Sequence, residues 1–171
     1  MVTKLFDASE ISLRVSAVAA EIVAALSVDF TVVGLLKGSF VLMADLVRAL
    51  DAVGAKPRIE FIRLSSYGNT KESSGRVQRI GELPNGLVGR RVLLVDDIVD
   101  TGRSMAHAKE ELIECGVDQI WTCALVDKSS RREVHFEADF VGFSIDDVFV
   151  VGYGIDYAED YRHLPYIGKI D

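Results

Sequence analysis

The sequence has few cysteines and no cluster of histidines. Cys115 and Cys123 are the only two cysteines among 171 residues, and neither has a second thiol or a histidine at metal-ligand spacing. His135 and His163 are also isolated. We therefore assign none of these four residues to a metal, and we interpret both cysteines as reduced structural thiols, since a small buried hydrophobe is the commoner role of cysteine.

Long apolar runs and an excess of positive charge are also missing. No run approaches the roughly 20 apolar residues that span a bilayer, and the N-terminus lacks the long apolar region of a signal peptide. We therefore expect a cytoplasmic protein with no membrane partner. The 26 acidic residues outnumber the 19 basic ones, for a formal net charge of -7. This balance argues against a nucleic-acid surface, which normally presents a basic face.

The composition does supply enough apolar residues for a core. A hydrophobic share of 49% and a charged share of 26% over 171 residues are typical of one compact domain. Segments with strand-like and helical spacing alternate: strands are expected at 31–36, 58–64, 77–80, 92–95 and 120–126, and helices at 7–26, 40–50 and 105–113. Because the strand-like segments end on polar residues, we predict an α/β fold with a central parallel sheet and a site along its carboxyl edge.

The most informative stretch is 91–104, RVLLVDDIVDTGRS, in which a buried strand is expected to end on carboxylates. Asp96, Asp97 and Asp100 occupy three of five positions and repel one another unless a cation or sugar hydroxyls lie among them. Residues 101–104 then offer two hydroxyls, a glycine and a guanidinium before a helix, an arrangement typical of a phosphate cradle. By pattern alone, the stretch also fits an ordinary loop whose last aspartate or threonine caps the helix.

Three other polar segments follow expected strands. Lys37 and Gly38 come after the first strand and fit either a binding loop or a tight turn with a solvated lysine. Lys128 follows the strand 120–126 and is, taken alone, an ordinary solvated lysine. The glycine-punctuated segment 65–76 far exceeds the usual connection of about four to six residues, so it is either a hairpin tip or a lid.

In combination, these motifs resemble those of the type I phosphoribosyltransferases, specifically the short bacterial hypoxanthine-guanine phosphoribosyltransferases. Residues 96–104 match the family motif for phosphoribosyl diphosphate (PRPP), which pairs two acidic residues with a loop ending in Asp-Thr-Gly-basic-Ser/Thr. Residues 36–39, LKGS, are similar to the diphosphate loop, whose peptide bond before the lysine can be cis. The resemblance covers residues 35–165. It implies the type I phosphoribosyltransferase fold in a single domain, 1–171, with a hood from the C-terminal segment and a mobile lid at about 65–78.

The implied reaction belongs to purine salvage. It transfers the 5-phosphoribosyl group from PRPP to a 6-oxopurine, hypoxanthine and/or guanine, and gives IMP or GMP and diphosphate. The resemblance also implies Mg²⁺ as cofactor and a homodimer or homotetramer. Since the protein is acidic overall, local cations and a divalent metal must neutralise the substrate.

The same resemblance implies a role for each matching residue. Asp96 and Asp97 hold the ribose hydroxyls and Mg²⁺, and Asp100 also exchanges the proton at purine N7. The 5-phosphate is surrounded by Asp100, Thr101, Gly102, Arg103 and Ser104, the diphosphate by Lys37, Gly38 and Arg162, and the base by Ile98, Lys128, Phe149, Val150 and Asp156. Asp156 also lies near a second metal, and Ser66 and Tyr67 belong to the lid.

Two departures from the family pattern and two rival functions follow. Asp96 stands where many relatives have Glu, and Arg103 where Lys is common; both keep the charge and alter the reach. One rival is a phosphoribosyltransferase for xanthine or adenine. An ammonium at Lys128 selects a 6-oxo acceptor over a 6-amino donor, which argues against adenine and leaves xanthine open. The other rival is a nucleotide- or PRPP-sensing regulator of the same fold, which the presence of Asp100, Lys37 and Arg162 disfavours.

Overall fold

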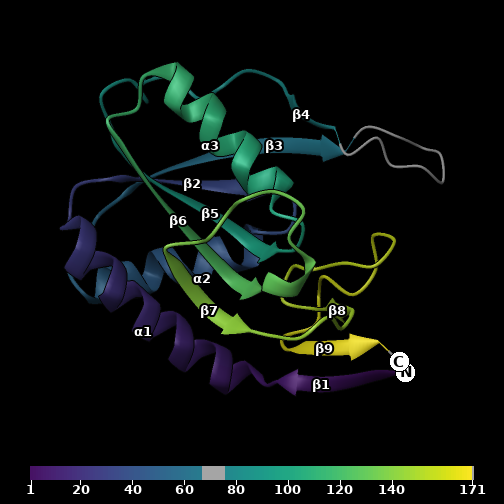
Figure 1. The fold of residues 1–171 in the computed structure, drawn as a ribbon. Helices are drawn as coiled ribbons and strands as arrows, with labels where there is room; N and C mark the ends of the chain where they lie inside the picture. The colour runs from purple at the N-terminus through teal and green to yellow at the C-terminus, as the bar shows by residue number, and fades with distance from the viewer. Residues whose placement is uncertain (67–75, 171) are drawn as a thin grey trace.

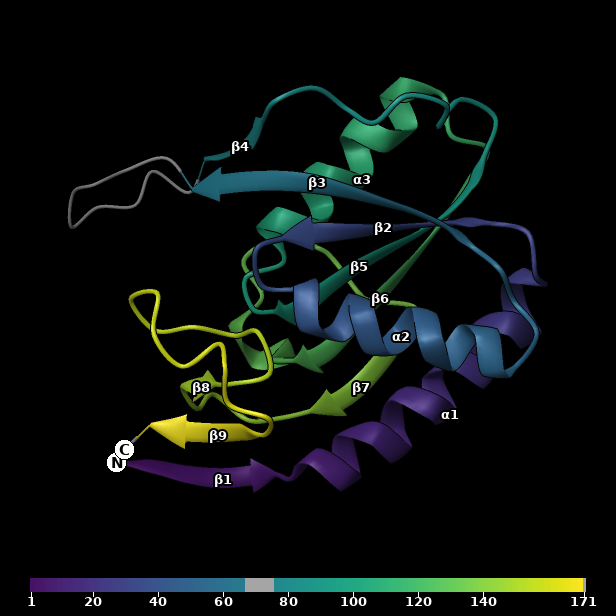
Figure 2. The same ribbon diagram turned by 180° about the vertical axis from the view of Figure 1, so that it is seen from behind.

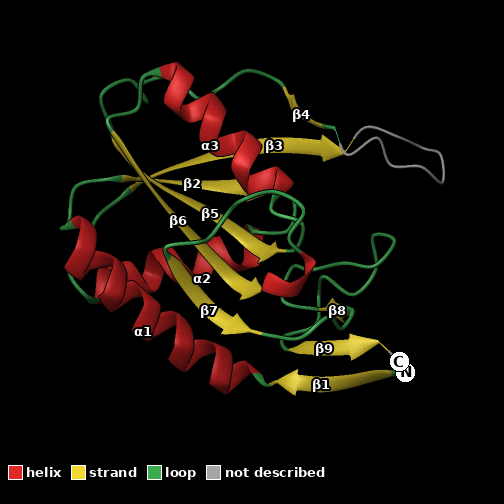
Figure 3. Cartoon of the chain, in the orientation of Figure 1, coloured by secondary structure: helices red, strands yellow, loops and turns green. Residues whose placement is uncertain are grey.

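A computed structural model describes residues 1–66 and 76–170 and confirms the predicted central sheet (Figures 1 and 3). Its strand order is β4-β3-β2-β5-β6-β7, and every neighbouring pair is parallel except β3 and β4. The strands are β2 (Thr31–Leu36), β3 (Arg58–Ser66), β4 (Val77–Ile80), β5 (Arg91–Val99), β6 (Gln119–Asp127) and β7 (Phe140–Ser144). β7 had not been predicted from the sequence.

Helices cover both faces of this sheet, as Figures 1 and 2 show from opposite sides. α1 (Ala8–Leu26) and α2 (Phe40–Ala52) pack on the face that contains Leu93, and α3 (Arg103–Cys115) packs on the face that contains Leu94. Successive residues of a strand point to opposite faces, so both leucines of β5 are fully buried. None of the helices in the described ranges is long and apolar enough to cross a bilayer.

The ends of two helices follow from local chemistry. Asp7 is the N-cap of α1: its carboxylate accepts hydrogen bonds from the Ser9 and Glu10 backbone N–H groups, at 2.8 and 2.9 Å. Gly116 ends α3 with a φ of 94°, a left-handed conformation that favours glycine. The helices expected at 7–26 and 105–113 are thus confirmed.

The central strand β5 is longer than predicted. The sequence indicated an end at the first carboxylate, yet the strand runs on through Val99, with Asp96 opposite Ala124 and Val99 opposite Asp127 of β6. Ladder hydrogen bonds use backbone groups, so the polarity of the side chains does not stop the pairing. As a result Asp96 and Asp97 belong to a sheet strand and not to a loop.

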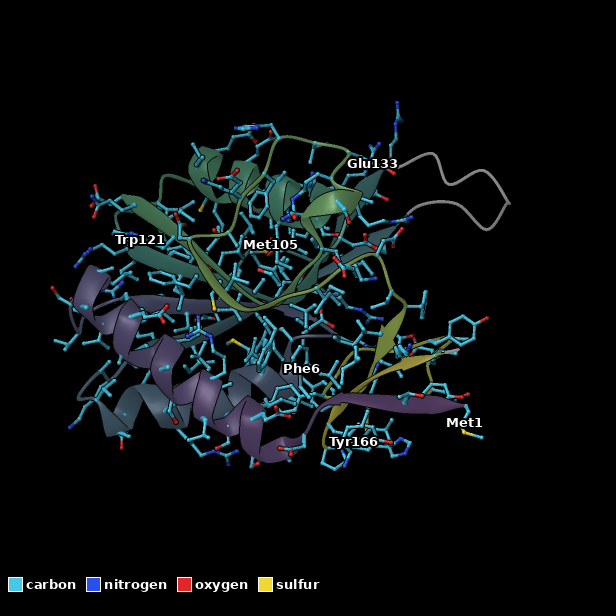
Figure 4. All side chains as sticks on the ribbon, turned by 60° about the horizontal axis from the view of Figure 1, so that its bottom comes forward. Met1, Phe6, Met105, Trp121, Glu133 and Tyr166 are labelled. Carbon is cyan, nitrogen blue, oxygen red and sulfur yellow. The ribbon has the colours of Figure 1, made fainter. Side chains whose placement is uncertain are left out.

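A second, antiparallel sheet has the order β1-β9-β8 and joins the two ends of the chain. It consists of β1 (Val2–Phe6), β8 (Val150–Val151) and β9 (Ile167–Ile170). Val2 pairs with Ile170, which places the termini side by side in Figures 1 and 2. The ring of Phe6, labelled in Figure 4, stacks on that of Phe143 in β7 with centroids 4.0 Å apart. Sequence reasoning missed this sheet, because its strands are short and pair across the whole chain.

Candidate active site

A cavity of about 440 Å³ lies at the carboxyl ends of β5 and β6. The C-terminal segment approaches the sheet at this edge (Figure 1). It brings together most of the residues proposed from the sequence: Lys37, Gly38, Asp96, Asp97, Ile98, Asp100, Thr101, Gly102, Ser104, Lys128, Phe149, Val150, Asp156 and Arg162. Val99, Met105 and Ile155 also line it and had not been singled out. Met105, labelled in Figure 4, is a fully buried residue of α3, so its only signal in the sequence was that of a core residue.

Asp96 and Asp97 form a buried acidic pair, with 9% and 8% of their surfaces exposed. The Asp97 N–H donates to Asp96 Oδ1 at 2.9 Å, and the Ile98 N–H donates to Asp97 Oδ1 at 2.8 Å. Burial raises the pKa of both carboxyl groups, and the charge of Asp97 raises the pKa of Asp96 further. A bound cation would relieve this accumulation of negative charge.

The acidic pair fits Mg²⁺ better than a metal held by protein alone. In the described part of the chain, no group of three or more His, Cys, Asp or Glu side chains is placed to hold an ion. Mg²⁺ is usually bound through one or two carboxylates together with water and substrate phosphates. Two carboxylates beside the loop that is expected to bind phosphate match that mode.

The Lys37–Gly38 loop packs directly on the acidic pair. The Leu36–Lys37 peptide bond is cis, as the resemblance implied. A Cβ atom added to Gly38 would lie 2.0 Å from Asp97 Oδ2, so only glycine fits beside this carboxylate. The Gly38 carbonyl oxygen in turn lies against Gly154, where an added Cβ would approach it to 2.3 Å. Two glycines thus let three chain segments meet at the cavity wall.

The expected phosphate loop leads into the N-terminus of α3. Gly102 precedes the helix with a φ of 85°, and the N–H groups of a first helical turn lack partners within the helix. Arg103 is the exception among the loop residues, because it does not line the cavity. Its Nε donates to Glu133 Oε2 at 2.8 Å, and Glu133 is labelled in Figure 4. Only the backbone of Arg103, at the start of α3, is therefore placed to contribute to the expected phosphate loop.

Lys128 is buried, contrary to the simple expectation of a solvated lysine. Only 5% of its surface is exposed, and its Nζ lies 5.8 Å from the centroid of the Phe149 ring. Within residues 1–66 and 76–170, this ammonium has no hydrogen-bond acceptor. Lys128 also lines the cavity, so a ligand oxygen there would supply a hydrogen-bond acceptor for its ammonium. Phe149 itself is half exposed, and its ring meets Tyr157 edge-on.

The two cations expected at the diphosphate end are paired with carboxylates. Lys37 Nζ lies 2.7 Å from Glu159 Oε2, and Arg162 Nη2 lies 2.9 Å from Asp156 Oδ1. The hydrogen bond and charge of Lys37 lower the pKa of Glu159. Sequence reasoning missed Glu159, which is an exposed residue of a turn and carries no motif. A phosphate group bound at Lys37 would compete with the Glu159 carboxylate for the lysine ammonium.

The predicted lid lies mostly outside the described residues. Tyr67 falls in the gap between 66 and 76, and Ser66 is the last residue of β3.

Comparison with known proteins identifies the family. A family model described as "Phosphoribosyl transferase domain" matches residues 1–158. The chain belongs to the phosphoribosyltransferase family. Among curated phosphoribosyltransferases, the hypoxanthine phosphoribosyltransferase of Escherichia coli K12 is 45% identical over 142 residues, covering 83% of this chain and 78% of the relative. The hypoxanthine-guanine enzyme of Aquifex aeolicus is 42% identical, covering 98% of this chain and 93% of the relative.

A solved phosphoribosyltransferase structure agrees with this assignment. The hypoxanthine phosphoribosyltransferase of Trypanosoma cruzi, in complex with the product IMP, superimposes with a TM-score of 0.89 at 36% identity. The match covers 98% of this chain and 93% of that one. The type I phosphoribosyltransferase fold and the family resemblance inferred from the sequence are confirmed.

Proposed function

We propose that this phosphoribosyltransferase acts in purine salvage and transfers the 5-phosphoribosyl group of PRPP to hypoxanthine and/or guanine. The observation that supports the proposal is Lys128: the residue is buried, it lines the cavity, and its ammonium lies beside Phe149 with no hydrogen-bond acceptor in the described residues. The same cavity holds the phosphate loop and the acidic pair. A 6-oxopurine supplies both an oxygen acceptor for Lys128 and an aromatic face for the Phe149 ring.

The proposed reaction exchanges one bond at the anomeric carbon of PRPP for another. The bond from C1 to the diphosphate oxygen breaks, and its electron pair leaves with the diphosphate. A bond forms from C1 to purine N9, and Asp100 accepts the proton that leaves N7. Lys37 and Arg162 stabilise the departing diphosphate through their positive charges. To bind it, each has to exchange a carboxylate partner, Glu159 or Asp156, for phosphate oxygens.

The remaining residues bind and orient the substrates. Thr101, Gly102 and Ser104 surround the 5-phosphate together with the backbone of Arg103 at the start of α3. Asp96 and Asp97 hold the ribose hydroxyls and Mg²⁺, which when bound neutralises part of the charge of the diphosphate. Ile98, Val150 and Asp156 border the purine.

The family resemblance leads to further proposals about the protein's setting. We expect a homodimer or homotetramer in the cytoplasm, and light scattering coupled to size exclusion measures the molecular mass of the assembly directly.

A base-specificity assay tests the proposed function. Diphosphate release and nucleotide formation are followed with PRPP and Mg²⁺ in the presence of hypoxanthine, guanine, xanthine or adenine. We expect turnover with hypoxanthine, guanine or both, and a kcat/KM for adenine lower by roughly 10⁴-fold, because a 6-amino donor leaves Lys128 unpaired. A higher kcat/KM for xanthine or adenine than for hypoxanthine and guanine would show that the proposed substrate is wrong. If the protein binds PRPP but releases no diphosphate with any of the four bases, it would be a regulator and not an enzyme.

A further inference from the structure

The backbone of Asp100 is held by a partly buried arginine, Arg132. Arg132 Nη1 donates to the carbonyl oxygens of Asp100 at 2.8 Å and Val99 at 3.1 Å, and its Nε donates to the carbonyl oxygen of Phe136 at 2.8 Å. Its side chain is only 16% exposed and also pairs with Asp127. With the main chain held in this way, the freedom that remains at Asp100 is rotation of its side chain.

The neighbouring arginine restrains that rotation. Arg131 lies in the 3₁₀ turn η1 (Ser129–Arg131), and its Nε donates to Asp100 Oδ1 at 3.2 Å. Its Nη1 lies 3.7 Å from Asp147 Oδ2, two residues before Phe149. In the described residues, the second oxygen of Asp100, Oδ2, has no hydrogen-bond partner. One carboxylate oxygen is thus held, and the other is left for a proton.

We propose that Arg131 is a positioning residue that orients the Asp100 carboxylate toward the purine and ties it to the segment carrying Phe149. Arg131 itself does not line the cavity, so it acts through Asp100 and not on the substrate. The inference rests on the proposed function, in which Asp100 exchanges the purine proton.

A rate effect is expected with little effect on stability. The Arg131 and Asp100 side chains are 47% and 40% exposed, and ion pairs of this kind contribute little to the free energy of unfolding. By contrast, a displacement of about 1 Å of a reacting group can cost roughly 10²-fold in rate. Because the hydrogen bonds of Arg132 remain, replacing Arg131 should leave the loop backbone in place.

The test compares R131Q and R131K with the control R48Q. Arg48 pairs with Asp45 at 2.6 Å on α2, is 74% exposed and lies outside the cavity. For R131Q we expect kcat to fall about 10-fold or more, with KM for PRPP within about 2-fold and an almost unchanged Tm. R131K keeps the charge but can hold only one of the two carboxylates, so it should recover part of the loss. R48Q should match the parent protein in both constants.

A double-mutant cycle with D100N separates orientation of Asp100 from other causes. If Arg131 acts through Asp100, R131Q should cost nothing further in the D100N background. The inference is overturned if R131Q keeps the parent kcat, or if its loss is equally large in the D100N background. Failure of the parent protein to form IMP or GMP would instead overturn the proposed function, so the two failures are distinct.

Discussion

Replacing Gly38 by alanine tests how closely the diphosphate loop and the acidic pair must meet. The new Cβ would lie 2.0 Å from Asp97 Oδ2, 2.5 Å from its Cγ and 2.8 Å from its Oδ1. An ordinary contact to a Cβ begins at 3.4 Å, so the carboxylate or the loop has to move by well over 1 Å. The loop has little room to retreat, because the Gly38 carbonyl oxygen already lies against Gly154. Movement of Asp97 would strain its hydrogen bond from the Ile98 N–H.

The expected consequence is a loss of activity larger than the loss of stability. Overpacking of this kind typically costs about 1–3 kcal/mol in the free energy of unfolding. Displacing both the carboxylate proposed to bind ribose and the loop proposed to bind diphosphate by about 1 Å should lower kcat/KM for PRPP by roughly 10²-fold. KM for hypoxanthine should change much less, because Lys128 and Phe149 belong to other segments.

Steady-state kinetics and thermal melting of G38A provide the measurement, with G86A as control. Gly86 has a positive φ, 78°, and an added Cβ there has no neighbour within 4 Å. G86A should therefore lose about 1 kcal/mol of stability from backbone strain, with no change in kinetics. Parent-like kcat and KM for PRPP in G38A would refute the proposed contact between this loop and the acidic pair.

Three further predictions follow from the same site. D100A should lower kcat by about 10² to 10⁴-fold while PRPP binding, measured by calorimetry, is spared; unaltered turnover would reject its role in proton transfer. K128M should lower kcat/KM for hypoxanthine by about 10 to 10²-fold and weaken the discrimination against adenine in the base assay, since one hydrogen bond to a charged group is lost. Burial and the charge of Asp97 raise the pKa of Asp96 above the ordinary value of 3.8. Between pH 3.8 and this raised pKa the folded state binds more protons than the unfolded state, so the stability of the parent protein falls as the pH rises through that window. In the presence of a chelator, D96N should therefore melt at a higher temperature than the parent at pH 7 while losing activity, and an equal or lower Tm would contradict this.

The sequence by itself determined the elements with strong local signals. The helix 8–26 is specified by its apolar spacing and by Asp7 as cap, and the strand 31–36 by a short, mostly apolar run. The polar residues directly after the strands were also visible, but by pattern alone they fitted ordinary loops and turns as well as a binding site, and the resemblance to the type I phosphoribosyltransferases decided between these interpretations. That is why most of the cavity lining could be named in advance.

Tertiary structure decided what depends on segments far apart in the chain. The sheet of β1, β9 and β8 exists because residues 2–6 pair with residues 167–170, and no local pattern predicts such a pairing. Lys128 has the sequence context of a solvated lysine, yet the fold buries it beside Phe149. Arg131 and Glu159 acquire their partners Asp100 and Lys37 only when loops from different strands meet at one edge of the sheet. Local sequence sets hydrophobic spacing and caps, whereas the charges that face one another are set by long-range packing.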